Sequence, residues 1–278
     1  MSRLFVVATP IGNLGDITLR ALEVLRSVPL VAAEDTRHSR KLLTHYEIKT
    51  RLVSYHAHNR RARAGELLEA LAQGDVALLT DAGTPVISDP GQELVGAAAA
   101  AGHEVVAIPG PSALTAALSV SGIAAAVVHF AGFLPRRGGE RRRALARWRG
   151  VRGGAEGEAL VLFEAPHRLA GTLTDALAEL GDGQVALCGD LTKRFEKVFR
   201  GTLSEAIDEV GRNEPRGEFT LVIALPLAGP RESGDLGQRF RELVAEFGGD
   251  RKRALGALAE ESQRPRKELY GKLMVGGG

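Results

Sequence analysis

Apolar runs of strand length alternate with helical patterns along the first half of the chain. The runs that are short and apolar enough to form buried strands are residues 4–8, 30–33, 52–55, 76–80 and 105–108. Between these runs the apolar residues repeat at helical spacing, and Asp16 is placed to cap a first helix that reaches about Ser27. Alternating strands and helices are typical of an α/β fold, and we expect one such domain over residues 1–121.

The second half of the chain has strands in a less regular order. Further strands are expected at residues 127–130, 160–163, 185–187, 197–200 and 219–224, and helices at about 141–148, 169–180 and 204–210. Adjacent strands around residues 195–200 predict a mixed rather than a purely parallel sheet. Because the pattern changes after Gly122, we expect a second α/β domain over residues 122–228.

The last part of the chain, residues 235–278, is helical in pattern and follows a polar segment with proline and glycine at 226–234. Asp250 is placed to cap the second of three short helices. Pro265 is expected at the first position of the third helix, where Leu269 and Tyr270 would face inward. Three short helices with a basic last helix resemble a helix-turn-helix module that contacts RNA. A helical cap with no nucleic-acid role fits the pattern equally well.

The composition is that of an ordinary globular protein, with 44% apolar and 25% charged residues among 278. Its one cysteine, Cys188, excludes an internal disulfide and a multi-cysteine zinc site, and we expect no metal. No apolar stretch is long enough to span a bilayer, and the first residues have the pattern of a strand rather than of a signal peptide. We therefore expect a cytoplasmic protein.

Positive charge is concentrated in one segment, although the net charge is only +2. A single acid, Glu140, is interspersed there among eight arginines: Arg136, Arg137, Arg141, Arg142, Arg143, Arg147, Arg149 and Arg152. Clustered guanidinium groups favour binding to a polyanion such as a phosphate backbone. Taken alone, the run fits a solvated helix face equally well.

Three loops that directly follow expected strands are rich in glycine and proline: residues 8–16, 80–91 and 108–113. In an open α/β sheet, ligands bind beyond the carboxyl ends of the strands, and glycines let the backbone approach a ligand closely. Three such loops in one half of the chain predict a cofactor pocket rather than plain turns. The first strand is not followed by the dinucleotide-binding glycine pattern, and the sequence has no ATP-binding loop, nucleophile elbow or zinc-type histidine pair.

These three loops and several further segments resemble one protein family. The further segments are Ala-Glu-Asp-Thr-Arg at 33–37, Gly-Phe-Leu-Pro at 132–135, Glu-Ala-Pro-His-Arg at 164–168 and Gly-Glu-Phe-Thr-Leu at 217–221. Together they are similar to the tetrapyrrole-methylase-like fold and, more narrowly, to its RNA branch, the ribosomal RNA small subunit methyltransferase I family. A further match at 267–270 extends the resemblance over essentially the whole chain. One departure is Cys188-Gly189-Asp190, where an Arg-Glu pair is expected.

The resemblance implies two α/β domains of the tetrapyrrole methylase type, with S-adenosylmethionine held in the cleft between them, and a small C-terminal helical module. It also implies methyl transfer to the 2′-hydroxyl of a cytidine ribose in small-subunit (16S) ribosomal RNA. The implied partners are ribosomal RNA or the small ribosomal subunit, and a second copy of the chain in a homodimer. The residues expected to touch the methyl donor are Pro10, Gly83, Thr84, Pro85, Ile87, Ser112, Ala113, Phe163, Glu164, Phe219 and Thr220.

Methyl transfer from a sulfonium to oxygen is an in-line displacement, in which the protein mainly aligns acceptor and donor. A ribose hydroxyl is a weak acid, so a general base, or a charge that stabilises the alkoxide, would help. Asp35, Lys193 and Glu196 are the candidates, because each lies near the end of an expected strand or in the adjoining loop. Each of them also fits a surface ion pair.

The basic residues, taken together with the resemblance, favour contact with RNA. Those expected to touch phosphates are Arg37, Arg40, Lys41, Arg136, Arg137, Arg141, Arg142 and Arg143. Two alternatives stay open: a small-molecule methylase of the same fold that acts on a tetrapyrrole, and a non-catalytic RNA-binding protein with a vestigial pocket. The arginine run and the helical tail argue against the first, and binding of the donor would exclude the second.

Overall fold

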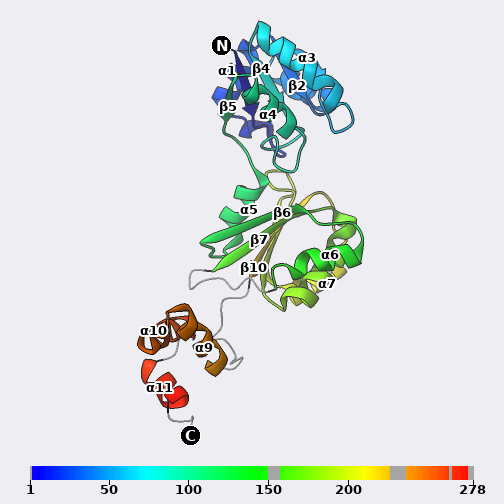
Figure 1. The fold of residues 1–278 in the computed structure, drawn as a ribbon. Coiled ribbons are helices and arrows are strands. Elements are labelled where there is room, and N and C mark those ends of the chain that lie inside the picture. Colours follow the sequence, from blue (N-terminus) through cyan, green and yellow to red (C-terminus); the bar gives the residue numbers. More distant parts are fainter. Residues whose placement is uncertain (1, 150–156, 226–235, 263–264, 275–278) are drawn as a thin grey trace.

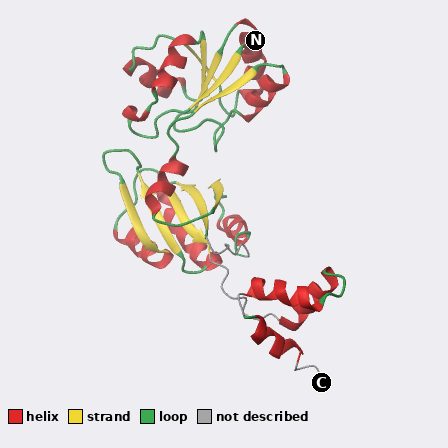
Figure 2. Cartoon of the chain, turned by 90° about the vertical axis from the view of Figure 1, so that its left-hand side faces the viewer, coloured by secondary structure: helices red, strands yellow, loops and turns green. Residues whose placement is uncertain are grey.

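The computed structural model describes residues 2–149, 157–225, 236–262 and 265–274. They form two α/β parts, each built on a five-stranded sheet, followed by a helical tail (Figures 1 and 2). The α/β fold class predicted from the sequence is confirmed. The segment with proline and glycine at 226–234 lies outside the described residues.

The first sheet is entirely parallel, in the order β3-β2-β4-β1-β5. Its strands are β1 (Arg3–Val7), β2 (Leu30–Ala33), β3 (Arg51–Ser54), β4 (Val76–Leu79) and β5 (Glu104–Ile108). Helices α1 (Leu19–Ser27) and α2 (Thr36–His45) cover one face, and α3 (Arg60–Gln73) and α4 (Gln92–Ala100) cover the other. Because the strands are parallel, their carboxyl ends meet at one edge of the sheet, where ligands bind in open α/β folds.

Burial on both faces explains why the three inner strands, β1, β2 and β4, are continuous apolar runs. Successive side chains of a strand point to opposite faces, so a strand between two helical layers needs apolar residues at every position. On β1, Phe5 packs with α1 on one face, and Leu4 packs with α3 and α4 on the other. The sequence pattern therefore located these strands within a residue or two.

The first helix begins later than the sequence predicts. A 3₁₀ turn, η1 (Leu14–Asp16), occupies the residues before it, and Ile17 follows in an extended conformation. Thr18 then caps α1, because its side chain accepts a hydrogen bond from Ala21 N at 3.1 Å. The prediction of Asp16 as the N-cap is wrong, since the intervening extended residue carries its carboxylate away from the first helical turn.

The second sheet is mixed, as predicted, in the order β6-β7-β10-β8-β9, and of its strand pairs only β6–β7 is parallel. Its strands are β6 (Val127–Phe133), β7 (Glu158–Glu164), β8 (Gln184–Gly189), β9 (Lys197–Thr202) and β10 (Phe219–Leu225). Helices α6 (Gly138–Ala146), α7 (Pro166–Leu180) and α8 (Leu203–Arg212) cover one face. Helix α5 (Ala113–Ser121) packs on the other face against β8 and β10.

Helix α5 packs with the second sheet, although it precedes Gly122. Its Ala117 is buried in one cluster with Val161 and Val222 of that sheet. The chain therefore passes from the first sheet to the second directly after β5, one helix earlier than a division between residues 121 and 122 would place it. The apolar pattern of α5 predicts a buried face but does not identify the sheet that buries it.

The tail has a small core of its own, formed by α9 (Leu236–Glu246), α10 (Arg251–Ser262) and α11 (Arg266–Met274). Asp250 caps α10 as predicted, because its carboxylate accepts hydrogen bonds from the backbone of the first turn. Two expectations for α11 are wrong. Pro265 precedes the helix instead of beginning it, and Tyr270 is 56% exposed instead of facing inward. Tyr270 lies about 100° around the helix from the buried Leu269, outside the narrow apolar stripe.

Candidate functional site

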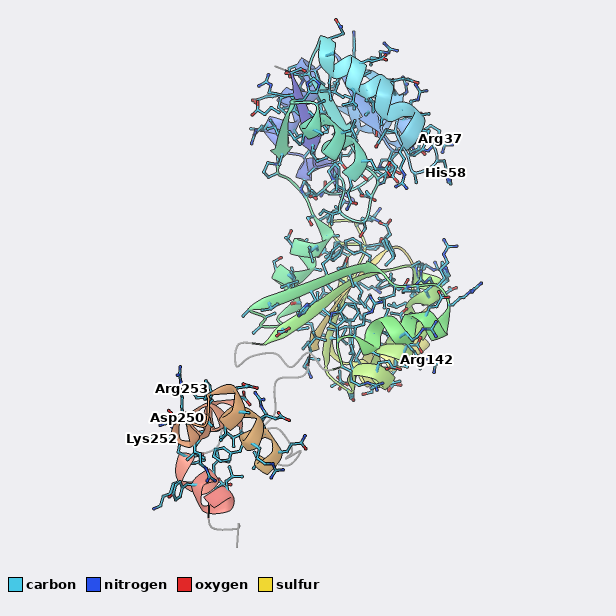
Figure 3. The ribbon with its side chains drawn as sticks, in the orientation of Figure 1. Arg37, His58, Arg142, Asp250, Lys252 and Arg253 are labelled. Carbon is cyan, nitrogen blue, oxygen red and sulfur yellow. The ribbon has the colours of Figure 1, made fainter. Side chains whose placement is uncertain are left out.

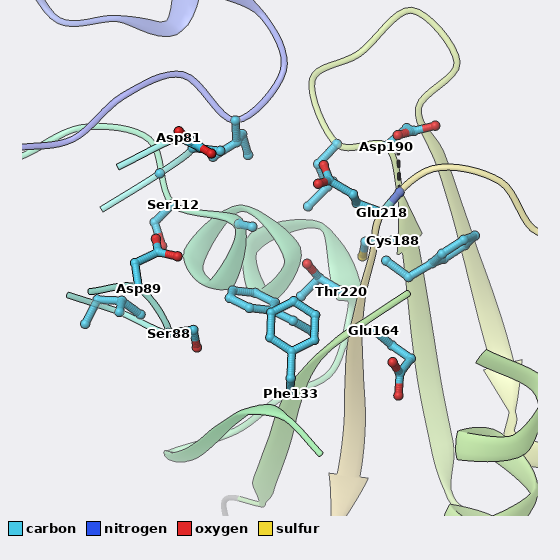
Figure 4. Close-up of a pocket in the computed structure, with 18 of the residues that line it drawn as sticks. Asp81, Ser88, Asp89, Ser112, Phe133, Glu164, Cys188, Asp190, Glu218 and Thr220 are labelled. Atoms are coloured by element: carbon cyan, nitrogen blue, oxygen red, sulfur yellow. Dashed lines mark hydrogen bonds between the residues drawn. The ribbon is translucent and has the colours of Figure 1, made fainter. Parts of the chain in front are cut away.

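A cavity of about 410 Å³ lies between the carboxyl edge of the first sheet and the second sheet (Figure 4). Loops after four parallel strands converge on it from the first α/β part. Ile11 follows β1, Glu34 follows β2, Gly83 follows β4 and Ser112 follows β5. The convergence follows from the topology, because parallel strands end at the same edge.

The second sheet closes the cavity with the ends of β6, β7 and β8 and with the start of β10. Because β10 runs antiparallel to β7 and β8, its first residue, Phe219, pairs with Glu164 of β7 and Gly189 of β8. Phe133 at the end of β6 pairs with Phe163 of β7, and their rings meet edge to face with centroids 5.7 Å apart. The second sheet therefore supplies a largely aromatic wall.

Most residues expected from the sequence to touch a donor meet at this cavity. All of them line it except Pro10, which directly precedes the lining residue Ile11, and Pro85, which is buried. The carboxylates that line the cavity from the first part are not among those expected. The sequence could have identified these carboxylates, because Glu34, Asp81 and Asp89 all lie in segments that carry the family resemblance.

These three carboxylates, Glu34, Asp81 and Asp89, form what we call the first rim. Thr80 Oγ1 lies 2.9 Å from Glu34 Oε2 and 2.7 Å from Asp89 Oδ2. A hydroxyl has one hydrogen, so it donates to only one of the two carboxylates unless the other carries a proton. Burial raises the pKa of Asp89 to about 6, against the effect of the Thr80 hydrogen bond and with a contribution from the charges of Glu34 and Asp81. The first rim therefore concentrates negative charge at the cavity.

Glu164, Asp190 and Glu218 line the cavity from the second part and form the second rim. Glu164 is buried, and its Oε2 accepts a hydrogen bond from Thr172 Oγ1 at 2.6 Å. Its Oε1 lies 3.1 Å from Arg168 Nε. Buried charge is tolerated when it is paired and hydrogen-bonded, so this carboxylate is part of the local architecture.

Arg168 also holds the segment that follows β6. Its guanidinium donates a hydrogen bond to Leu134 O at 2.6 Å, one residue after Phe133. The Glu164–Arg168 pair therefore connects the end of β7 to the end of β6, the two strand ends that carry the aromatic wall.

Lys193 lines the cavity and is paired with the other two members of the second rim. Its Nζ lies 3.0 Å from Asp190 Oδ1 and 2.8 Å from Glu218 Oε2. Burial alone would lower the pKa of Lys193, but the hydrogen bonds to Glu218 and Asp190 outweigh it and raise the pKa above its usual value. Lys193 is therefore a cation and cannot act as a base. Asp190, part of the departure from the family pattern, is one of the groups that hold it.

The structure does not bring the other two candidate catalytic residues to the cavity. Asp35 caps α2 by accepting from Arg37 N at 2.8 Å, and the Arg37 side chain, which hydrogen-bonds it, holds the pKa of Asp35 well below its usual range. Glu196 accepts a hydrogen bond from Thr192 N and stabilises the loop between β8 and β9. Both carboxylates are used locally, so neither is suited to be the general base.

All but one of the expected phosphate-binding residues are exposed. The exposed ones are Arg37, Arg40, Lys41, Arg136, Arg137, Arg142 and Arg143, of which Figure 3 labels Arg37 and Arg142. Arg141 differs, because its side chain is only 11% exposed and lies 2.7 Å from Asp175 of α7. It joins α6 to α7, which corrects the expectation that it contacts phosphate. Arg152 lies outside the described residues.

Two classes of site are not found in the described part of the chain. No group of three or more histidine, cysteine, aspartate or glutamate side chains is arranged there to hold a metal ion. None of the helices described is long and apolar enough to cross a membrane.

The buried thiol of Cys188 also lines the cavity. Burial raises the pKa of this thiol to about 11, so it stays protonated and is a poor nucleophile.

The sequence matches the family model for tetrapyrrole (corrin/porphyrin) methylases over residues 3–207. The chain belongs to this family. A protein from Synechocystis sp. named ribosomal RNA small subunit methyltransferase I is 48% identical over 275 residues, which cover 97% of this chain and 96% of that protein. A Thermotoga maritima protein of the same name is 46% identical over 225 residues, covering 81% of this chain and 99% of its own length. The chain is thus a member of the ribosomal RNA small subunit methyltransferase I branch.

Solved structures support the same fold. Uroporphyrin-III-C-methyltransferase from Thermus thermophilus matches with a TM-score of 0.55 at 23% identity, covering 80% of this chain and 94% of that one. A structure of that enzyme complexed with S-adenosyl homocysteine matches with a TM-score of 0.56 at 20% identity, covering 80% and 97%. A diphthine synthase matches with a TM-score of 0.62 at 16% identity, covering 81% and 90%. At these identities the likeness concerns the fold.

Proposed function

We propose that the chain is an S-adenosylmethionine-dependent methyltransferase that acts on the 2′-hydroxyl of a cytidine ribose in small-subunit ribosomal RNA. The observation that carries the proposal is the cavity in which the Gly/Pro-rich loops of the first sheet meet the second sheet. The names of the relatives support ribosomal RNA as the substrate. The choice of the ribose oxygen of cytidine rests on the sequence resemblance.

The residues at the cavity fit the donor. Its volume of about 410 Å³ is in the range of small-molecule sites, roughly 300–1,000 Å³. S-adenosylmethionine is a sulfonium cation with an ammonium group, and the first rim offers it the carboxylates of Glu34, Asp81 and Asp89. Phe163 and Phe219 offer apolar surface to an adenine ring, and Ser112 opens helix α5 beside them. When bound, the donor supplies an activated methyl group.

The protein's own contribution is alignment and electrostatics. In a displacement with an activated donor, holding the acceptor oxygen in line with the methyl group accounts for much of the rate enhancement. Of the three candidate catalytic residues, Lys193 is the one that lines the cavity, and it does so as a cation. We assign it the stabilisation of negative charge on the acceptor oxygen.

Exposed basic residues support the RNA part of the proposal. Helices α2 and α6 present arginines and a lysine to solvent, and α10 begins with Arg251, Lys252 and Arg253, of which Figure 3 labels the last two. We assign the tail to RNA capture and the whole chain to a homodimer, which sedimentation equilibrium would test.

A protein that ends near Gly229 should then fold and bind the donor, but it should methylate its substrate far more slowly. Loss of folding in the truncated protein would make the tail a structural cap.

The direct test is methylation of small ribosomal subunits purified from a strain that lacks its own enzyme of this family. The purified chain and isotope-labelled S-adenosylmethionine should yield 2′-O-methylcytidine in the nuclease digest, read by mass spectrometry. A base-methylated nucleoside would overturn the assignment of the acceptor oxygen. Methylation of a tetrapyrrole but not of RNA would support the small-molecule alternative, and absence of donor binding in calorimetry would support a non-catalytic RNA-binding protein.

A further inference from the structure

The loop between β8 and β9, residues 190–196, carries an exposed aromatic side chain near the cavity. Phe195 is 73% exposed, and the Arg194 guanidinium carbon lies 5.5 Å from the centre of its ring. A single exposed apolar residue is common on protein surfaces. The setting of Phe195 is less common, because the loop beneath it is held in a defined conformation.

Several interactions fix this loop. Lys193 N donates to Asp190 O at 2.9 Å, and Glu196 N donates to Lys193 O at 3.1 Å. Thr192 N donates to the Glu196 carboxylate, while the Lys193 side chain joins the loop to Glu218. Asp190 and Thr192 have φ angles of 49° and 65°, which non-glycine residues adopt only where the surroundings impose them. Phe195 is thus presented on a rigid support, so little ordering entropy is lost when it binds a planar partner.

The loop forms part of the cavity wall and contacts the first α/β part. Its Leu191 and Lys193 line the cavity. On the other side it lies against the loop after β1, so closely that a side-chain carbon built at Gly12 would be 2.5 Å from Lys193 Cγ. Phe195 follows Lys193 by two residues, at most about 7.6 Å along the backbone. A nucleotide that reached Lys193 would bring its neighbour to Phe195.

We propose that Arg194 and Phe195 form a stacking platform for the unpaired base next to the nucleotide that is methylated. The proposal rests on the proposed function and extends it to the recognition of RNA beside the target. Sequence-specific RNA recognition uses unstacked bases of single-stranded segments, which stack on aromatic rings and on guanidinium planes. Arg194 adds a positive charge that suits the adjoining phosphate, and exposed Lys197 adds another. A macrocycle bound wholly inside the cavity would need neither residue.

The first measurement is steady-state methylation of small ribosomal subunits at saturating donor. Phe195→Ala should raise KM for the subunits about tenfold, the size expected for the loss of one stacked base, while kcat and the Kd for the donor change little. Phe195→Tyr retains a ring and should restore KM. Leu19→Ala is the matched control, because Leu19 is a comparably exposed apolar side chain (79%) on α1 that does not line the cavity. An unchanged KM for Phe195→Ala would overturn the proposal.

A second measurement separates this proposal from the proposed function. A short RNA with 2-aminopurine beside the target cytidine should lose fluorescence on binding the wild-type chain through stacking, and Phe195→Ala should abolish that loss. The fluorescence measurement does not require methyl transfer. It therefore still tests the stacking platform if the wild-type chain methylates no RNA and the proposed function fails. If Phe195→Ala instead changes the sedimentation coefficient and leaves the fluorescence unchanged from wild type, the side chain belongs to an interface between proteins and the platform is refuted.

Discussion

The two rims of the cavity use the same chemical group in different ways. The second rim has three carboxylates, and each lies beside a cation: Glu164 beside Arg168, and Asp190 and Glu218 beside Lys193. The first rim also has three, but their hydrogen-bond partners among the described residues are the Thr80 hydroxyl and a backbone N–H. On the second rim two cations therefore face three carboxylates, so most of the negative charge is compensated there, whereas no ion pair of this kind in the described part of the chain compensates the first rim.

This difference separates structural carboxylates from binding carboxylates. The pairs of the second rim hold strand ends and loops in place, and they keep Lys193 at the cavity as a cation. A partly buried carboxylate that lies near other carboxylates, as Asp89 does, has a raised pKa and reduces the stability of the fold at neutral pH. We infer that the first rim tolerates this cost because a cationic ligand supplies the missing positive charge, as the sulfonium of the proposed donor would.

The largest effect is expected from breaking the buried pair of the second rim. Arg168→Met leaves the Glu164 carboxylate buried without its cation and should destabilise the fold by about 3 kcal/mol, lowering Tm by roughly 6–12 °C. Arg212→Met removes an exposed arginine that pairs with Glu209 and should change Tm by less than about 2 °C. Thermal unfolding followed by circular dichroism measures both. Equal changes in the two variants would show that the pair is not structural.

A bulky side chain between the rims should have the next largest effect. Ser112→Trp places an indole in the cavity and should weaken donor binding about a hundredfold or more, measured by calorimetry. Thr115→Trp is the matched control, because Thr115 is exposed on the same helix and does not line the cavity. Unchanged donor affinity in folded Ser112→Trp would place the donor elsewhere.

Neutralising the first rim should have opposite effects on binding and on stability. Asp89→Asn removes a charge near the cationic donor, so donor affinity at pH 7.5 should fall about tenfold. Because the folded pKa, about 6, exceeds the unfolded 3.8, the carboxyl stabilises the fold when protonated, and this contribution is lost as the pH rises through 6. The free energy of unfolding of the variant at pH 7.5 should therefore be about 1 kcal/mol higher than that of the wild type, which raises Tm by a few degrees.

The affinity of the wild type for the donor should rise as the pH increases through 6, whereas the affinity of Asp89→Asn should change little with pH. A steep rise in the variant would assign the titration to another group.

The smallest effect concerns the arginines, where the largely covered Arg141 contrasts with the exposed Arg142 and Arg143, although Arg142 Nε also lies 3.9 Å from Asp175 Oδ1. Replacing exposed Arg142 and Arg143 by alanine should reduce the log–log salt slope of RNA binding by about 1.4–1.8, since each phosphate contact contributes about 0.7–0.9. Arg141→Ala should leave that slope unchanged and lower Tm instead, because Arg141 pairs with Asp175. Filter binding at several salt concentrations and thermal melting separate the two effects. If Arg141→Ala changed the salt slope as much as the double replacement of Arg142 and Arg143 does, the assignment of Arg141 to a structural role would be refuted.

The sequence by itself determined the elements and the general place of the site. Apolar runs located the strands because strands between two helical layers are buried on both faces, and the Gly/Pro-rich loops located the pocket because parallel strands end at one edge. The apolar runs and the Gly/Pro-rich loops are local patterns, so they can be recognised from residues that are close together in the sequence. Asp250 belongs to the same class, since a cap acts within one turn of its helix.

Only the tertiary structure decided which of two adjacent residues does what. Glu34 lines the cavity while Asp35 caps α2, and the Arg141 side chain is largely covered beside Asp175 while Arg142 and Arg143 stay exposed. Residues of one type side by side give the same local signal. Their roles depend on partners far along the chain, such as Asp175, which lies 34 residues after Arg141. The same holds for α5, whose apolar face reveals that it is buried but not which of the two sheets buries it, because that depends on the path of the whole chain.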